Sequence, residues 1–348
     1  MDPGFRRDDD EAVELARPEV ITSLLGNKHL FPGRPSLGIQ FESAPVFAEG
    51  TMPDPVIIDN LSHSYGRRVI YQNLSLRLQA GRVYGLLGKN GVGKTTLIKI
   101  LMGFLKPLGG RCQILDDPAN HLSPGTRSRV GLLFERHLAY DFLSIEQIEK
   151  FYSGFYPSWR PELFWGMVDR LGLPNNHRIA DMSEGQRSQV VLGLTVAQDP
   201  ELLILDDYSM GLDAGYRRLF IDYLSDHLKD GRHTVILTSH VIQDMENFVD
   251  EIIFLERGGR ILRTLMSDFI RDFKLYRLPR DGFDGPPPPR SEIIKNVEEH
   301  PAHWDIFSFA DQGRVAEALA ASWAGSTERL EQQPMSLEDA FVGYTGRY

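Results

Sequence analysis

A glycine-rich loop between an apolar strand and a helix is the feature that most constrains this chain. The segment from Gly88 to Thr95 reads GKNGVGKT and fits the pattern G-x-x-x-x-G-K-[ST]. It follows the apolar run 83–87 and precedes a helical pattern over 95–105. Glycines let successive N–H groups turn inward, and a helix start favours anions, so the loop is predicted to bind phosphate. The alternative, a chance glycine-rich turn, does not require the flanking strand and helix.

The other apolar segments predict an α/β fold. Short, nearly continuous apolar runs alternate with helical stretches, which is typical of a parallel sheet covered on both faces. The predicted strands are 56–58, 83–87, 130–134, 202–205, 235–237 and 252–255. Between about 141 and 199 the strand pattern stops, and Ser144 with Gln147 predicts a helix that starts with a capping box. We therefore expect a helical insertion in the sheet domain.

Composition limits the class of protein. With 348 residues, 42% hydrophobic and 25% charged, the chain can bury a substantial core and is expected to fold in the cytoplasm. Its net charge of −10 argues against a protein that wraps nucleic acid. The single cysteine, Cys112, excludes an internal disulfide framework and a zinc site built on several thiolates. We find no apolar run of about eighteen residues and no secretion signal, so any membrane role is expected to come through a partner.

The two ends of the chain differ from its middle. Residues 1–51 contain five prolines and a charged run, without a sustained period, and are expected to be a disordered or non-native lead. Met52 is then a natural translation start; the alternative is a functional N-terminal extension. Near the other end, four consecutive prolines from Pro286 to Pro289 predict a stiff connector. It lies within residues 266–348, which we expect to form a small α+β module with strands near 273–278 and 292–297 and a helix over 313–323.

The predicted strand 202–205 ends at Asp206, which is expected to supply a carboxylate beside the phosphate loop. Mg²⁺ bound with a nucleotide needs such a carboxylate, and the Thr95 hydroxyl is the expected second ligand. Lys94 is expected to reach the β- and γ-phosphates. An acid that merely caps a strand is the alternative interpretation of Asp206.

With the loop and Asp206 in place, the segment from Met182 to Gln186, MSEGQ, is similar to the LSGGQ signature of the ATP-binding subunits of ABC transporters. The resemblance covers residues 56 to about 262, with every landmark in the family's order. It implies a P-loop NTPase with a RecA-like sheet core and a helical signature subdomain, within an ATP-binding domain of residues 52–265. It also implies that two chains sandwich two ATP molecules with Mg²⁺.

The resemblance assigns roles to individual residues. Tyr65 would stack on adenine, and His240, in the segment Thr-Ser-His, would sense the γ-phosphate. The loop contacts to phosphate would come from Gly88, Asn90, Gly91, Gly93, Lys94, Thr95 and Thr96. The signature contacts to the other subunit's ATP would come from Ser183, Gly185 and Gln186, and the Mg²⁺ contacts from Thr95, Glu135 and Asp206. The catalytic set would be Asp207, His240 and Lys94. The alternatives remain open: Tyr65 as a core or surface tyrosine, Ser183 as a plain N-cap, and His240 as a structural histidine.

Four positions depart from the family pattern. Asp207 replaces the catalytic glutamate and is one methylene shorter, which predicts slow hydrolysis because small placement errors are costly. Tyr208 replaces a proline, Glu184 replaces a signature glycine with an acid, and Glu135 replaces the usual glutamine. None of these changes removes the phosphate loop or Asp206, so ATP binding is still expected.

Two further segments point to a subclass. The ending from Ser336 to Phe341, SLEDAF, resembles ATP-binding subunits of ABC-2 exporters, and its structural interpretation is a helix that docks Leu337 and Phe341 on the C-terminal module. The aromatic stretch 151–159 resembles the GntR-regulated branch of that group, with core packing or partner contact as the alternative.

Taken together, the resemblance implies the ATPase subunit of an exporter. It would sit on the inner face of the cell membrane through separate transmembrane permease subunits, as a homodimer or heterodimer, with no nucleic-acid partner. One alternative is a regulatory subunit with weak or vestigial hydrolysis. Another is an ABC-type protein that acts on ribosomes or DNA, but such proteins usually carry two cassettes or long coiled coils.

Overall fold

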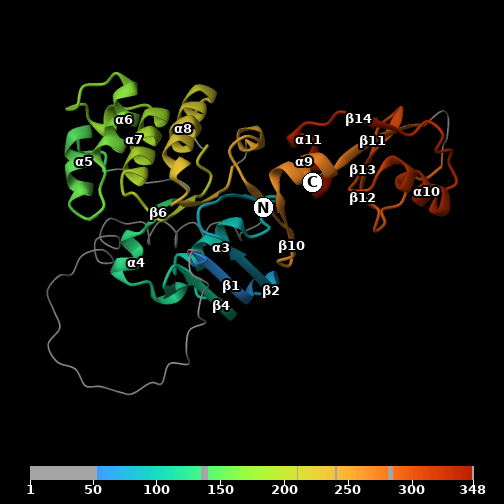
Figure 1. The fold of residues 1–348 in the computed structure, drawn as a ribbon, viewed down its shortest axis with the longest axis horizontal. Coiled ribbons are helices and arrows are strands. Elements are labelled where there is room, and N and C mark those ends of the chain that lie inside the picture. The colour runs from blue at the N-terminus through green and yellow to red at the C-terminus, as the bar shows by residue number, and fades with distance from the viewer. Residues whose placement is uncertain (1–52, 135–139, 210, 240, 281–284, 347–348) are drawn as a thin grey trace, which may run out of the picture.

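The computed structural model describes residues 53–134, 140–209, 211–239, 241–280 and 285–346 (Figure 1). The predicted lead 1–51 lies outside these ranges. The strands are β1 (Val56–Tyr65), β2 (Arg68–Leu78), β3 (Val83–Leu87), β4 (Gly109–Ile114), β5 (Asp117–Pro118), β6 (Val130–Leu133), β7 (Leu202–Leu205), β8 (Thr234–Leu237), β9 (Glu251–Leu255), β10 (Ile261–Leu265), β11 (Lys274–Pro279), β12 (Ile294–Glu299), β13 (His303–Ser308) and β14 (Glu331–Gln333). The α-helices are α3 (Lys94–Leu101), α4 (Pro124–Ser128), α5 (Ile145–Ser153), α6 (Pro161–Val168), α7 (Glu184–Val196), α8 (Ala214–His227), α9 (Met266–Asp272), α10 (Gln312–Ser322) and α11 (Leu337–Thr345).

The central sheet has six strands in the order β10-β9-β3-β8-β7-β6. All neighbouring pairs are parallel except β10 and β9 at one edge. Alternate residues of each strand enter different cores: Leu203 and Leu205 of β7 join one apolar cluster, and Leu202 and Ile204 join the other. Because both faces are buried, the strands are continuously apolar, and the predicted α/β class is confirmed.

A second, antiparallel sheet covers one of these cores in the order β2-β1-β4-β5. The sequence analysis expected only residues 56–58 as a strand here, whereas β1 continues to Tyr65. In β1, buried residues such as Val56, Ile58 and Leu61 are interspersed with more exposed polar ones. This mixed pattern belongs to a sheet with only one face buried, which a search for continuous apolar runs does not detect.

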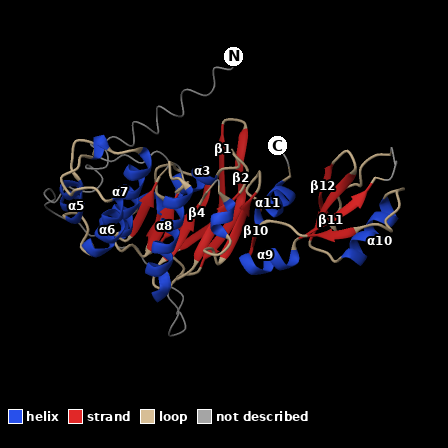
Figure 2. Cartoon of the chain, turned by 90° about the horizontal axis from the view of Figure 1, so that it is seen from above, coloured by secondary structure: helices blue, strands red, loops and turns tan. Residues whose placement is uncertain are grey.

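Helices α5, α6 and α7 gather at one end of the molecule around an apolar cluster of their own (Figures 1 and 2). The predicted capping box is confirmed at α5: Gln147 N–H donates to Ser144 Oγ at 3.3 Å, and Ser144 N–H donates to Gln147 Oε1 at 3.0 Å. None of the helices that the structure describes combines the length and apolar character needed to cross a bilayer.

At the opposite end, β11 to β14 form a four-stranded antiparallel sheet in the order β12-β13-β11-β14, packed against α10 (Figure 2). The final helix, α11, does more than the predicted docking on this module. Its Leu337 and Tyr344 also enter the core of the central sheet, where Tyr344 lies 4.4 Å from Phe254 of β9 between ring centroids. The Gln243 amide donates to Glu338, which ties α11 to the 3-10 helix η5 (Ile242–Met245).

Candidate nucleotide-binding site

The phosphate loop leads from β3 into α3 through a conformation that requires glycine. Gly93, the N-cap of α3, has φ of 118°, and a Cβ there would lie 2.6 Å from the Tyr71 hydroxyl and 2.7 Å from Ile70 Cγ2. Gly88 is equally confined, since a Cβ there would lie 2.5 Å from the Leu255 carbonyl oxygen. Among the described residues no side chain caps the start of α3. The N-terminal amides of this helix therefore face the loop, as an anion site requires.

Two side chains from β2 hold the loop in shape. Arg68 Nη2 donates to the Gly91 carbonyl at 2.6 Å, and the Tyr71 hydroxyl donates to the Gly93 carbonyl. Tyr71 is almost completely buried. These two donors hold the carbonyls of Gly91 and Gly93 in place. The sequence analysis did not identify either residue.

Lys94 folds back into the loop. Its Nζ donates to the Gly88 carbonyl at 2.6 Å and to the Lys89 carbonyl at 3.3 Å. Burial lowers the pKa of the Lys94 ammonium, while the negative charges of Asp206 and Asp207 act in the opposite direction. The loop lysine and both acids thus lie within electrostatic reach of one another.

Thr238 connects the two acids that follow β7. Its hydroxyl donates to Asp206 Oδ1 at 2.8 Å and accepts the Asp207 N–H at 2.7 Å. Asp206 is 3% exposed, at the end of a strand buried on both faces. Thr238 is a positioning residue that the sequence analysis missed as a site member. The available signal was its place just after the neighbouring parallel strand β8, whose carboxyl end meets that of β7.

Asp207 is held in a defined orientation. Its backbone has φ of 50°, in the left-handed region that non-glycine residues rarely occupy. The Ser209 hydroxyl donates to Asp207 Oδ1 at 3.0 Å and accepts from Ser239 Oγ at 3.0 Å. A strained residue supported by two neighbouring segments is typical of functional sites.

Tyr208 has a packing role. It is 1% exposed, its ring centroid lies 5.6 Å from that of Phe220, and its hydroxyl donates to Asp244 Oδ2 at 3.2 Å. Arg217 Nε donates to the same oxygen at 2.8 Å. Burial raises the pKa of the Tyr208 phenol. Tyr208, which stands where the family pattern has a proline, therefore anchors η5 beside Asp206 and Asp207.

Tyr65 stands at the end of β1 with 43% of its surface exposed. Its ring packs edge-on against His63, with centroids 4.9 Å apart. The exposed ring is compatible with stacking on a planar base.

The signature segment starts α7. Ser183 is the N-cap: its Oγ accepts the Gln186 N–H at 3.3 Å, and Gln186 Oε1 accepts the Ser183 N–H at 3.0 Å. The Glu184 side chain lies over Gly211, because a Cβ on that glycine would be 2.9 Å from Glu184 Cγ. Gly185 lies beside the same loop, since its own Cβ would be 3.2 Å from the Gly211 carbonyl oxygen. The signature and the loop at Gly211 thus form one surface.

Glu135 and His240, predicted for Mg²⁺ and for the γ-phosphate, lie outside the described residues. The donor set that is described fits a magnesium nucleotide: an uncapped helix start, the partly buried Lys94, the Thr95 hydroxyl at the first turn of α3, and a carboxylate from Asp206. Mg²⁺ requires oxygen ligands, and phosphate requires the N–H groups of a helix start.

The chain resembles known proteins in both sequence and structure. Residues 71–209 match the family model described as ABC transporter. Nod factor export ATP-binding protein I of Cupriavidus pinatubonensis (strain JMP 134 / LMG 1197) is 29% identical over 294 residues, covering 81% of this chain and 88% of that protein. A solved ATP-binding subunit of an ABC transporter is similar with a TM-score of 0.56 at 21% identity, covering 62% of this chain and 92% of that one. A bacterial Atm1-family ABC exporter with ATP bound gives a TM-score of 0.55 at 22% identity, covering 70% of this chain and 42% of that one.

Proposed function

We propose that this chain, whose residues 71–209 match the ABC transporter family model, is an exporter-type ATP-binding subunit that binds and hydrolyses ATP to power export through separate transmembrane subunits. The observation that carries the proposal is the uncapped start of α3, with Lys94 in electrostatic reach of Asp206 and Asp207. We assign residues 52–265 to the ATP-binding domain, including a helical subdomain of about 141–199, and residues 266–348 to an accessory module.

Nucleotide binding would use the loop and β1. The amides between Gly88 and Gly93 and at the start of α3 would hold the phosphates, with Asn90, Gly91 and Thr96 lining the same cradle. Lys94 would exchange its bonds to loop carbonyls for phosphate oxygens, and the exposed ring of Tyr65 would stack on adenine. An anion next to Lys94 would raise the pKa that burial now lowers, so the lysine would be charged when nucleotide is present.

Mg²⁺ would be held by Thr95 and Asp206, with Glu135 as a further ligand. When bound, Mg²⁺ supplies positive charge to the phosphate oxygens. Thr238 would keep the Asp206 carboxylate in place through its hydrogen bond to Oδ1.

In hydrolysis, Asp207 would orient the attacking water or accept its proton, and His240 would contact the γ-phosphate. Ser209 and Thr238 fix the side chain and backbone of Asp207, so its reach is limited by its own length. Compared with a glutamate, the carboxylate is drawn back by one methylene. We therefore propose reduced turnover without loss of binding.

A complete site would need a second subunit. Ser183, Gly185 and Gln186 would contact the ATP bound by a partner chain, in a homodimer or a heterodimer. The dimer would sit at the inner face of the cell membrane through transmembrane permease subunits, with no nucleic-acid partner. The net charge of −10 supports the last point, since nucleic-acid binding favours a basic surface.

A regulatory subunit with vestigial hydrolysis is the second candidate function. The observation that favours it is the Ser209 hydrogen bond, which already occupies Oδ1 of a short carboxylate. In that case ATP would still close a dimer, and opening would depend on nucleotide exchange.

An ATPase assay of the wild type with Asp207→Glu and Asp207→Asn, with and without the reconstituted membrane subunits, separates the two. We expect measurable wild-type hydrolysis, a rise of about 10- to 100-fold in Asp207→Glu, and loss in Asp207→Asn, with similar ATP affinity throughout. Wild type that binds ATP but stays inactive with its partner would support the regulatory function. Equal rates in wild type and Asp207→Asn would remove Asp207 from the mechanism.

A further inference from the structure

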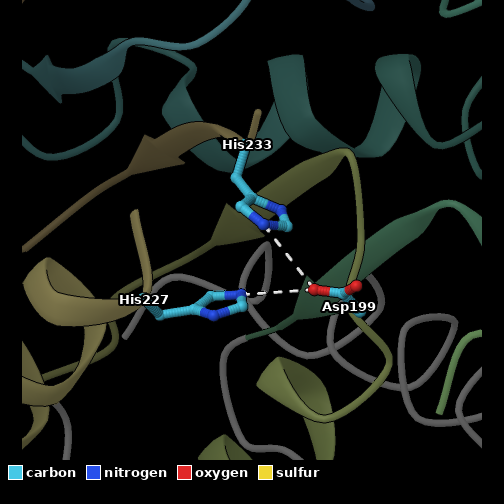
Figure 3. Close-up of side chains that lie close together, drawn as sticks. All are labelled: Asp199, His227 and His233. Atoms are coloured by element: carbon cyan, nitrogen blue, oxygen red, sulfur yellow. Dashed lines mark ion pairs between the residues drawn. The ribbon is translucent and has the colours of Figure 1, made fainter. Parts of the chain in front are cut away.

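The side chains of Asp199, His227 and His233 come from separate elements and lie close together (Figure 3). They stand at the amino ends of β7 and β8, whereas Asp206 and Asp207 follow the carboxyl end of β7. Asp199 precedes β7, His227 is the last residue of α8, and His233 directly precedes β8. Asp199 Oδ1 lies 3.6 Å from His227 Nε2 and 3.6 Å from His233 Nε2. One oxygen and two imidazole nitrogens therefore point toward a common position.

The spacing fits a metal ion better than direct hydrogen bonds. Zn²⁺ binds histidine nitrogen and carboxylate oxygen at about 2.0–2.2 Å, so neighbouring ligand atoms of a tetrahedron lie about 3.3–3.6 Å apart. At 3.6 Å these pairs are too long for a hydrogen bond. The three ligand atoms all lie within 4.8 Å of one another, as a single ion requires.

All three converging atoms are buried and make no hydrogen bond within the described part of the chain. The His233 side chain is 4% exposed and the His227 side chain 8%. Buried polar atoms in proteins are normally paired. Three such atoms directed at one point indicate a ligand between them.

The surroundings prepare each group for metal binding. The Nδ1 of His233 lies 2.7 Å from the Pro200 carbonyl oxygen, and a hydrogen bond donated there leaves the lone pair on Nε2, the usual second contact of a metal-binding histidine. Arg160 Nη1 lies 3.7 Å from Asp199 Oδ2, the oxygen that does not face the histidines.

We propose that Asp199, His227 and His233 bind one divalent transition-metal ion of the Zn²⁺ class. Two imidazoles and one carboxylate are ligands that Zn²⁺ favours and Mg²⁺ does not. Water can complete the fourth position of a tetrahedral ion. The ion would tie the segment after α7 to the end of α8 and the start of β8. Its role is structural, since it lies at the sheet edge opposite Asp206.

A second histidine–aspartate cluster provides a matched control. His300, His303 and Asp305 are also close together, but Arg277 donates to both carboxylate oxygens of Asp305, at 2.9 and 3.1 Å. The two histidines are 27% and 23% exposed. With its carboxylate occupied by a guanidinium, this cluster is expected to bind the ion far more weakly.

The test uses the full chain, stripped of metal with a chelator and titrated with Co²⁺ and then Zn²⁺ in excess Mg²⁺. We expect one Co²⁺ per chain, with the intense visible bands of a tetrahedral site, displaced by one equivalent of Zn²⁺. The variants His227→Gln and Asp199→Asn should bind at least about 10- to 100-fold more weakly, and His300→Gln with His303→Gln should bind as the wild type does. Zn²⁺ should also raise the melting temperature of the wild type and of the control.

Absence of tetrahedral Co²⁺ in the wild type would overturn the proposal, as would unchanged affinity in the first two variants or loss of binding in the control. If either variant fails to fold, X-ray absorption at the Zn edge of the loaded wild type decides. Two imidazoles with oxygen ligands support the site, and a shell without imidazole overturns it.

Discussion

Helices α3 and α7 both begin at a motif expected to meet phosphate, yet their first turns are built differently. Within the described chain, α3 starts at Gly93 without a side-chain cap, whereas α7 starts at Ser183 with a complete capping box. The start of α3 is therefore prepared for an external anion. The donors at the start of α7 are partly satisfied by their own chain, so a partner's phosphate would have to displace those bonds.

A third helix start shows that the capping box alone does not mark a site. Ser144 and Gln147 of α5 repeat the two hydrogen bonds of α7 at the same lengths, 3.3 and 3.0 Å. Ser144 is buried and Ser183 is exposed. A partner chain can reach only the exposed box, so accessibility separates the structural cap from the candidate site.

The largest expected effect comes from removing the cation at the start of α3. Lys94→Ala should lower ATP hydrolysis on the order of 100- to 1000-fold, because a partly buried positive donor that meets developing charge is lost. Nucleotide binding, measured by fluorescence titration, should weaken as well. Lys106→Ala, at an exposed lysine beyond α3, is the control and should behave as the wild type. Normal hydrolysis in Lys94→Ala would show that this helix start is not the phosphate site.

The sequence predicts the strands of the central sheet because both their faces are buried. All five residues of Val83–Leu87 are buried, and the run is apolar apart from the Tyr84 hydroxyl and the small Gly85. By contrast, only residues 56–58 of the one-sided sheet around β1 were predicted, since polar residues interrupt the apolar pattern of the rest of the strand. Burial on one face leaves a weaker signal than burial on two.

Side-chain partnerships across the sheet are harder to predict. Thr238 meets Asp206 and Asp207 only because β7 and β8 are neighbours, an adjacency that no local pattern encodes. Likewise, His227 and His233 lie close to Asp199 because α8 ends beside the amino ends of the neighbouring strands β7 and β8. Residue types at a strand end predict a site, and the strand order decides which side chains complete it.

An intermediate effect should distinguish the two capping boxes. Ser183→Ala and Ser144→Ala should each lower the free energy of unfolding by about 1 kcal/mol, because each removes an N-cap. Only Ser183→Ala should also reduce ATP-dependent dimerisation and ATPase activity, on the order of tenfold, since a hydrogen bond to a charged phosphate is stronger than a neutral one. Denaturant unfolding and analytical ultracentrifugation with ATP measure the two properties. Equal activity in both variants would assign Ser183 a purely structural role.

The smallest expected effect concerns the charge at the start of α7. Glu184 stabilises the helix start by its negative charge but opposes an incoming phosphate, and each interaction is worth about 0.3–1 kcal/mol. Glu184→Gln should therefore lower the free energy of unfolding slightly and strengthen ATP-dependent dimerisation about two- to fivefold. Glu146→Gln, in the first turn of α5, should show the stability change alone. Because the side chain is exposed, both changes should shrink as salt is raised. A dimerisation gain that is insensitive to salt would point to the packing of Glu184 against Gly211 instead of its charge.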